Sequence, residues 1–375
     1  MIKFFTFLII SICSANLSYS QWTNKNFSFD GINRQYRIYV PSNYNVSNPA
    51  SLVMTLHGMG DNMTNFSTIG MNNVADTANV IVIVPQALSD PNAGTTWNSG
   101  AGYMGYFPNS GTNDVGFLNA LLDTVQSNYA INQERVYCCG FSMGGFMTQR
   151  LACELANRFT AVASVAGTIG QNITTCNSSK VLPVAHFHGT SDGTVPYSNN
   201  SLGIDVDSLV SIWINRDNCS LSPIQTTFPD IAADGYTIDH FIYPNGEQGT
   251  EVELFKVIGA NHVWLTYGND INYTIEIWKF FNKHKTMTIA GNIELTLENN
   301  IEIFPNPVND KMTLKSNNNL KNYYEIIDMN GKTISSGEFI SEKSIATSEF
   351  KTGIYILNTS CSEKGLVKRQ KFVIN

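Results

Sequence analysis

Residues 135–146 read RVYCCGFSMGGF, an apolar run followed by a serine between glycines and by the start of a helical pattern. The run 135–139 predicts a buried strand, and residues 146–155 predict a helix. Between them, Gly140-Phe141-Ser142-Met143-Gly144 fits G-x-S-x-G, the sharp turn that raises a serine hydroxyl above a sheet edge at a helix N-terminus. Such a string also arises by chance in a glycine-rich loop without chemistry. The strand before it and the helix after it favour Ser142 as a nucleophile.

Short apolar runs alternate with helical patterns on both sides of this segment, from residue 35 to residue 284. This alternation predicts the α/β class, with a doubly wound, mostly parallel sheet covered on both faces. Helices are expected after Val115, Gly144 and Asp270, and Asn269 or Asp270 is the expected cap of the third. The expected strands are 36–40, 51–56, 80–84, 135–139, 159–165, 181–187 and 252–258.

The pattern divides the chain into four parts. Residues 1–20 fit a signal peptide, with Lys3 before an apolar run. The mature protein should therefore be exported by way of the periplasm, to the medium or to the cell surface. Residues 21–285 carry the α/β pattern, and 286–300 form the expected linker. Residues 301–375 show short β-like runs separated by Asn, Ser and Gly, which predict a small C-terminal β-sandwich with a turn at Met329-Asn330-Gly331.

Composition and motif content exclude several classes of partner. The net charge is -7 and the pI about 5.4, without any Lys/Arg block, so we expect neither nucleic acid nor an anionic membrane surface as a partner. No later apolar run approaches the ~20 residues of a transmembrane helix. CxxC and HExxH spacings are absent from the sequence, so we expect no metal site and no cofactor.

Among the cysteines we favour a disulfide bond between Cys153 and Cys176 and leave the other pairings open.

A serine nucleophile needs a base and an acid, which in this kind of turn follow in the chain order Ser, Asp, His. Asp192 lies in a loop after the strand 181–187, and His262 lies in the loop after the last strand of the α/β pattern. Asp205 and Asp207 are the competing acids, but they have no strand directly before them. The other histidines fit structural roles better: His57, His186, His188, His240 and His284.

Two backbone amides are expected to hold a developing oxyanion. One belongs to Met143, directly after the serine, and the other to Met59, in the loop after the strand 51–56. The segment 89–113 is rich in Gly and aromatics. It predicts either a substrate-binding rim or aromatics folded onto the domain's own surface. The expected substrate-binding residues are Trp97, Tyr103, Tyr106 and Phe107, with Trp264 beside the histidine.

These residues resemble the secreted α/β-hydrolases grouped as polyhydroxybutyrate depolymerase-like esterases, which include feruloyl and acetylxylan esterases. The resemblance implies ester hydrolysis through an acyl-enzyme, with Ser142, Asp192 and His262 as the triad. The chain departs from the family at Leu265, where relatives have a Pro-Gly turn, and at Asn245, where relatives often have a cysteine that could pair with Cys219. The resemblance covers nearly all of residues 30–284 and rests on Tyr39-Val40-Pro41, Leu56-His57-Gly58, Val84-Pro85-Gln86, Asp114-Val115-Gly116-Phe117, Gly140 to Gly145, His186 to Pro196 and Gly259 to Trp264.

The tail resembles the C-terminal sorting domain of the type IX secretion route, which implies the type IX machinery as a partner. A carbohydrate-binding or spacer sandwich is the alternative for this part. For the catalytic part, a serine peptidase on the same fold and a noncatalytic secreted binding protein remain as alternatives. The expected substrate is a carboxylic ester of hydroxyalkanoate, feruloyl or acetyl type, polymeric esters included. The tail's resemblance rests on residues 304–307 (FPNP), 327–332 (IDMNGK), 352–356 (TGIYI) and 371–374 (KFVI).

Overall fold

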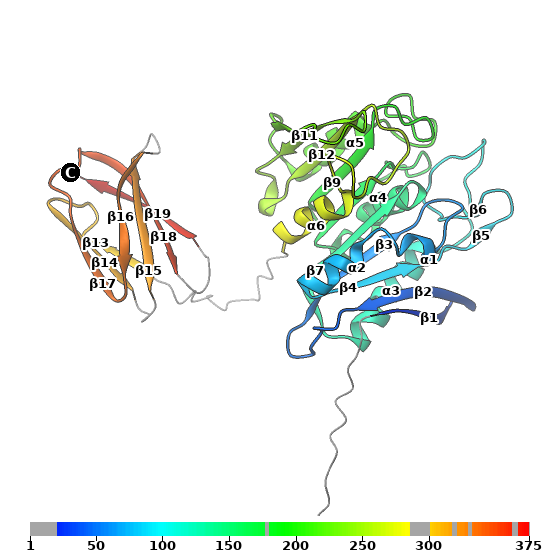
Figure 1. Cartoon of the computed structure of the whole chain (residues 1–375), viewed down its shortest axis with the longest axis horizontal. Coiled ribbons are helices and arrows are strands. Elements are labelled where there is room, and N and C mark those ends of the chain that lie inside the picture. Colours follow the sequence, from blue (N-terminus) through cyan, green and yellow to red (C-terminus); the bar gives the residue numbers. More distant parts are fainter. Residues whose placement is uncertain are drawn as a thin grey trace, which may run out of the picture. The chain divides into compact units, whose positions relative to one another are not determined.

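The computed structural model describes residues 21–176, 180–285, 301–316, 321–328, 332–361 and 367–374 (Figure 1). The expected signal peptide (1–20), linker (286–300) and turn (329–331) lie outside the described residues. The chain divides into two compact units, residues 1–288 and 289–375, each with a hydrophobic core of its own.

Among the described residues of the first unit, ten strands form one sheet in the order β1-β2-β4-β3-β7-β8-β9-β12-β11-β10. The central strands from β4 to β12 pair in parallel, and the strands at both edges pair antiparallel. Its strands are β1 (Gln21–Phe29), β2 (Ile32–Val40), β3 (Ala50–Leu56), β4 (Val80–Pro85), β7 (Ile131–Phe141), β8 (Ala161–Val165), β9 (Val184–Gly189), β10 (Ile224–Thr227), β11 (Thr237–Tyr243) and β12 (Val252–Ile258); β5 (Ser89–Asp90) and β6 (Gly94–Thr95) form a separate hairpin.

Helices cover both faces of this sheet (Figure 1). The helices α3 (Asp114–Asn128), α4 (Met143–Glu154) and α5 (Val206–Asp217) pack into one core, and α2 (Met71–Ala78) and α6 (Tyr273–Lys283) pack into the other. Every residue of β3 and β4 is buried, as expected for strands covered on both sides. The predicted doubly wound α/β class is confirmed. The short helices are α1 (Met63–Phe66), η1 (Ala156–Arg158) and η2 (Glu247–Gly249).

The carboxyl ends of the parallel strands lie level along one edge of the sheet. Leu56 of β3 pairs with Gly140 of β7, and Gly189 of β9 pairs with Val257 of β12. The loops that follow β3, β7, β9 and β12 therefore leave the sheet at the same edge, where ligands bind in open α/β sheets.

Several expected boundaries are wrong, and three of them have a clear local reason. The strand expected at 181–187 begins at Val184, directly after Pro183, which has no amide hydrogen for the sheet ladder. The strand expected at 159–165 begins at Ala161, after the turn of η1. The helix expected after Asp270 begins at Tyr273 and is capped by Asn272, while Asp270 accepts the amides of Ile231 and Ala232.

The second unit is built from two antiparallel sheets around one core, as predicted for a small β-sandwich. One sheet has the order β13-β14-β17 and the other β16-β15-β18-β19. The strands are β13 (Ile301–Phe304), β14 (Lys311–Ser316), β15 (Asn322–Asp328), β16 (Thr333–Phe339), β17 (Glu342–Ala346), β18 (Gly353–Cys361) and β19 (Val367–Ile374).

The expected disulfide between Cys153 and Cys176 is formed, and it ties the end of α4 to the chain that follows β8. Cys138, Cys139 and Cys219 are free thiols in buried positions. Cys219 packs against Gly246, where an added Cβ would lie 2.7 Å from its sulfur. In the portion of the chain that the structure covers, no helix has the length and apolarity to cross a bilayer.

Candidate active site

Ser142 lies at the junction of β7 and α4 with backbone angles of φ 53° and ψ -121°. A Cβ added at Gly140 would overlap the carbonyl of Gly144, and a Cβ added at Gly144 would overlap the carbonyl of Leu56. Only glycine lets strand, turn and helix approach this closely. The G-x-S-x-G segment therefore folds as the tight turn that its sequence predicts, with the strain concentrated at the serine.

Asp192 and His262 are joined by a hydrogen bond of 2.7 Å between Oδ2 and Nδ1. The other carboxylate oxygen of Asp192 accepts the amides of Thr194 and Val195 at 2.8 and 2.7 Å. Burial raises the pKa of Asp192, but the hydrogen bonds from His262 and the two amides outweigh burial, so its pKa lies below the ordinary value. The ionised carboxylate selects the His262 tautomer with the proton on Nδ1 and leaves Nε2 as an acceptor.

The two competing acids, Asp205 and Asp207, form hydrogen bonds with other residues. Asp205 accepts the amide of Asn200, and Asp207 accepts the hydroxyl of Tyr197. The structure thus brings Asp192, and neither of the two alternatives, into a hydrogen bond with the predicted base.

Phe141, the residue directly before Ser142, packs against His262. The ring of Phe141 lies 4.8 Å from the His262 ring, centroid to centroid, with 32° between the planes. Within the described chain, the Ser142 hydroxyl has no hydrogen-bond partner, so the serine–histidine bond itself is not formed. Such bonds are often long before substrate binds and tighten in the reacting complex.

The loop after β3 is held by the buried ring of His57. Its Nδ1 donates to the carbonyl of Gly58 at 2.7 Å, and its Nε2 accepts the amide of Ala87 at 3.1 Å. Burial lowers the pKa of His57, which keeps the ring neutral and lets one nitrogen donate while the other accepts. His57 therefore has the structural role that its position before the serine predicts.

This loop passes directly beside the serine. A Cβ added at Gly58 would lie 3.3 Å from the Cβ of Ser142, so Met59, the next residue, is adjacent to the turn. Met143 is the first residue of α4, and its amide has no acceptor inside the helix. Both methionines border the same cavity as Ser142.

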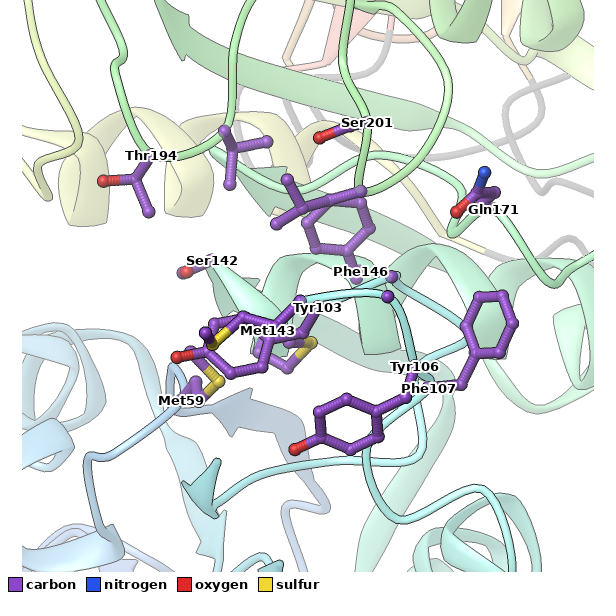
Figure 2. Close-up of a pocket in the computed structure, with 15 residues that line it drawn as sticks. Met59, Tyr103, Tyr106, Phe107, Ser142, Met143, Phe146, Gln171, Thr194 and Ser201 are labelled. Carbon is purple, nitrogen blue, oxygen red and sulfur yellow. The ribbon is translucent and has the colours of Figure 1, made fainter. Parts of the chain in front are cut away.

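A cavity of about 650 Å³ opens beside Ser142. Figure 2 shows Thr194 and Ser201 along one side, and Met59, Tyr103 and Tyr106 along the other. Its walls are chiefly apolar and aromatic with a few polar groups, the usual character of a small-molecule site. Further lining residues are Phe107, Met143, Phe146, Gln171, Val195 and Leu202.

The aromatic wall of the cavity is organised by Asp90. One oxygen of Asp90 accepts the amides of Asn92 and Ala93 and the hydroxyl of Tyr106, and the other accepts the amide of Asn109. These hydrogen bonds, led by those from Asn92 and Asn109, lower the pKa of Asp90 to about 2. The Asp90 carboxylate thus stabilises, through these hydrogen bonds, the loop that carries Tyr103 and Tyr106.

Two of the residues expected to bind substrate lie elsewhere. Trp97 is fully buried and donates its indole N–H to the carbonyl of His57 at 2.9 Å, so it supports the loop after β3 from behind and is absent from the cavity wall. Trp264 donates to Thr274 and packs edge-on against Phe141. By contrast, the expected rim aromatics Tyr103, Tyr106 and Phe107 do line the cavity.

Sequence analysis missed several residues of the cavity wall, and four of them show why. Thr194 and Val195 follow Asp192 by two and three residues. Their position in the loop that carries Asp192 could have indicated that they lie at the site. Phe146 lies on the first turn of α4 and reads as ordinary helix core. Gln171 is brought in from the chain after β8, and nothing in its local sequence indicates this position.

Comparison with known proteins gives two matches to protein families. Residues 44–220 match the phospholipase/carboxylesterase family, and residues 302–375 match the secretion system C-terminal sorting domain. The first match includes Ser142 and Asp192. The second covers the β-sandwich and indicates secretion or display at the cell surface by the type IX route.

Several curated relatives are fungal esterases. A probable feruloyl esterase C from Aspergillus niger is 25% identical over 250 residues, which are 62% of this chain and 82% of that protein. A bifunctional acetylxylan esterase/xylanase from Neocallimastix patriciarum is 26% identical over 62% of this chain and 31% of its own length. Feruloyl esterase D from Neurospora crassa is 30% identical over 182 residues, which are 45% of this chain and 56% of that protein.

Two solved esterase structures align with this chain at low identity. A ferulic acid esterase from Anaeromyces mucronatus, solved with ferulic acid, has a TM-score of 0.48 at 15% identity and covers 72% of this chain and 92% of its own. An acetyl xylan esterase from Aspergillus awamori has a TM-score of 0.49 at 14% identity and covers 69% of this chain and 99% of its own. On the family matches and the sheet topology, residues 44–220 are similar to the phospholipase/carboxylesterase family and lie in an α/β-hydrolase-like sheet, and residues 302–375 are similar to the secretion system C-terminal sorting domain.

Proposed function

We propose that the protein is a serine carboxylic-ester hydrolase in which Ser142, His262 and Asp192 form the catalytic triad. The observation that carries this proposal is the 2.7 Å hydrogen bond from His262 to the buried Asp192 at the sheet edge where Ser142 sits on its strained turn. The match to the carboxylesterase family supports the reaction class.

In the proposed reaction, Nε2 of His262 takes the Ser142 proton while the serine oxygen attacks the ester carbonyl. Asp192 holds the imidazole in the required tautomer and stabilises the imidazolium that forms. The amides of Met59 and Met143 receive the oxyanion. His262 then protonates the leaving alcohol, and water repeats the sequence to release the acid from the acyl-enzyme.

We further propose that the acyl group is bulky and aromatic, of feruloyl type. The cavity of about 650 Å³ is far larger than an acetyl group requires. Tyr103, Phe107 and Phe146 offer aromatic surface in the cavity that Ser142 borders, and aromatic rings pack well against one another in offset or edge-on geometry. The names of several relatives, which are feruloyl esterases, agree with this choice.

The substrate proposal is tested by comparing kcat/KM for methyl ferulate, acetylated xylan and hydroxybutyrate oligomers. We expect methyl ferulate to be preferred, and Phe107→Ala to weaken that preference without abolishing hydrolysis of a small activated ester. Equal or better cleavage of acetylated xylan would overturn the aromatic assignment while leaving the ester hydrolase in place. Hydrolysis of peptide substrates in preference to every ester would favour a serine peptidase instead.

The domain assignment is part of the same proposal. Residues 21–285 would act as the esterase, and residues 301–375 would carry the chain through the type IX machinery. The separate cores of the two units support this division.

A further inference from the structure

A continuous line of buried hydrogen bonds crosses the core of the first unit and ends at the loop that carries Asp192. Its members come from α4, α5, β8 and β9, and none is more than 1% exposed. Apart from the contacts of His188 with Val195 and Asp192, the line involves neither the proposed triad nor the loop after β3 that carries Met59. The side chains in the line are Trp213, Gln149, Ser164, His186 and His188.

The first half of the line joins two helices to the sheet. The indole Nε1 of Trp213 donates to Oε1 of Gln149 at 2.8 Å, and Nε2 of Gln149 donates to the hydroxyl oxygen of Ser164 at 2.7 Å. The Ser164 oxygen lies 2.7 Å from Nδ1 of His186.

The second half runs along β9 to the acid loop. Nε2 of His186 lies 3.0 Å from Nδ1 of His188. Nε2 of His188 lies 2.8 Å from the carbonyl oxygen of Val195 and 3.6 Å from Oδ2 of Asp192. That oxygen of Asp192 is the one that binds His262.

The two ends of the line fix the direction of every hydrogen bond in it. An indole N–H can only donate, and a carbonyl oxygen can only accept. His188 must therefore carry its proton on Nε2 and accept at Nδ1 from Nε2–H of His186. His186 must then accept at Nδ1 from the Ser164 hydroxyl. Both rings are neutral in this arrangement, and burial lowers the pKa of each, so they stay neutral.

The line ends at Val195, whose backbone also binds the Asp192 carboxylate. The amide of Val195 donates to Oδ1 of Asp192, and the carbonyl of the same residue accepts from His188. Nε2 of His188 also lies 3.6 Å from Oδ2 of Asp192, so its N–H dipole is close to the carboxylate charge. The titratable groups that face His188 are His186, Asp192, His262 and Tyr197, whose ring lies edge-on at 5.7 Å.

We propose that His188, oriented by His186 and Ser164, is a positioning residue that fixes the Asp192 carboxylate for its hydrogen bond to His262. This inference rests on the proposed triad. Hydrogen bonds aligned head to tail in a low-dielectric core strengthen one another. Loss of the hydrogen bond between Ser164 and His186 should therefore also weaken the interactions that position Asp192.

The tautomers can be measured on the unmodified protein by ¹⁵N NMR of labelled histidines. We expect His186 and His188 to remain neutral with the proton on Nε2 across about pH 5 to 8, the range in which histidines ordinarily change charge. A proton on Nδ1 of either ring, or a charged ring in that range, overturns the inference. This measurement requires no variant to fold.

Kinetics of variants tests the positioning role. His188→Leu removes the donor, and His188→Gln offers an amide N–H in its place. We expect His188→Leu to lower kcat about 10- to 100-fold with little change in KM, the size of effect caused by a small misplacement of a catalytic group. His188→Gln should recover part of this loss. Rates are normalised to sites titrated with a fluorophosphonate, so that a misfolded fraction does not count as lost activity.

A second pair of variants separates positioning from stability. Ser164→Ala and Tyr137→Phe each remove one buried hydroxyl, and that of Tyr137 donates to the carbonyl of His284, outside the line. We expect Ser164→Ala to lower kcat per site at least about threefold through the broken line, and Tyr137→Phe to leave it unchanged. The far-downfield Nδ1–H resonance of His262 should shift in Ser164→Ala and not in Tyr137→Phe.

The outcomes separate this inference from the proposed function. A wild type that reacts with the fluorophosphonate and hydrolyses esters, with kcat per site unchanged in His188→Leu, overturns the positioning role alone. If His188→Leu does not fold, equal kcat per site in Ser164→Ala and Tyr137→Phe overturns it. A wild type that neither reacts nor hydrolyses any ester overturns the proposed function and the positioning role with it.

Discussion

Nδ1 of His262 lies 2.7 Å from Oδ2 of Asp192, while Oδ1 of the same carboxylate accepts two backbone amides. Both oxygens of Asp192 are thus occupied by donors. Burial raises the pKa of Asp192, but the hydrogen bonds from these donors lower it by more, so the net pKa is depressed. A depressed pKa means that Asp192 stays ionised above about pH 4, the ordinary value for an aspartate, and loses its charge only at lower pH.

The first prediction concerns the pH dependence of activity. We expect kcat/KM for a neutral ester to fall as the pH is lowered through the range of about pH 8 to 5 in which histidines ordinarily change charge, with the limiting slope of a single ionisation, because a protonated imidazole cannot accept the serine proton. Asp192 stays ionised in that range, and the buried rings of His57, His186 and His188 have lowered pKa values, so none of them adds a second step. A constant rate down to about pH 4.5, with near-UV circular dichroism unchanged, would count against a histidine base.

The second prediction concerns Asp90, the centre of the aromatic loop. Asp90→Asn removes one acceptor oxygen and introduces an NH₂ group among the donors of Asn92, Tyr106 and Asn109. We expect KM to rise about tenfold with kcat nearly unchanged, because the cavity wall loosens while the triad keeps its geometry. The control is Asp123→Asn, whose carboxylate is 64% exposed on α3. A loss in kcat with unchanged KM would contradict this role.

The third prediction concerns stability. Asp217 is fully buried, and its Oδ1 has no hydrogen-bond partner among the described residues. Burial is the main cause that raises its pKa to about 7. The folded state therefore holds a proton that the unfolded chain releases above about pH 4, so this group makes folding less favourable as the pH rises toward 7.

Asp217→Asn should remove that penalty. We expect the variant to raise Tm by several °C at pH 8 and to change it little near pH 4, measured by differential scanning calorimetry with Asp123→Asn as the exposed control. The same shift in Tm at both pH values would show that the carboxyl charge is not the cause.

The fourth prediction concerns the two units. A protein of residues 21–285 should fold and keep its kcat/KM for a small soluble ester within about twofold of the full-length value, because compact domains with their own cores fold independently. The core of the first unit draws on residues up to Phe281, and that of the second on residues from Ile301. An insoluble or inactive truncation beside an active full-length protein would contradict the division.

The parts of the site that could be predicted from sequence are those with local steric requirements. Gly140 and Gly144 are needed because a Cβ at either position overlaps backbone, so the turn is visible as a motif. Asp192 and His262 could be placed because each follows a recognisable strand of a parallel sheet, and those strand ends share one edge.

The features that could not be predicted from sequence depend on contacts between segments that are distant in the chain. An aromatic in a glycine-rich loop carries no sign of which way it faces, and Trp97 turns inward to donate to His57. The line from Gln149 through Ser164 to His186 joins three elements that meet only in the folded sheet. The outer edge strand β10 was missed because all its residues are exposed, which leaves no alternation of apolar and polar residues for a pattern to detect.

Replacing residues of the proposed triad should lower activity by amounts that reflect the role proposed for each. Ser142→Ala and His262→Ala should each lower kcat by roughly 10⁴ to 10⁶, and Asp192→Asn by about 10⁴, because the imidazole remains but is wrongly oriented. The melting temperatures should stay close to that of the wild type for Ser142→Ala, since its hydroxyl makes no hydrogen bond within the described residues.

The most direct measurement is covalent labelling of Ser142 by a fluorophosphonate, read by intact mass and by peptide mapping. The account predicts one phosphonyl group per wild-type chain, located on Ser142, with loss of esterase activity in proportion to labelling. Ser142→Ala should remain unlabelled. Labelling of another residue, or a Ser142→Ala protein that keeps more than about a tenth of wild-type turnover, would contradict the assignment of Ser142 as the nucleophile.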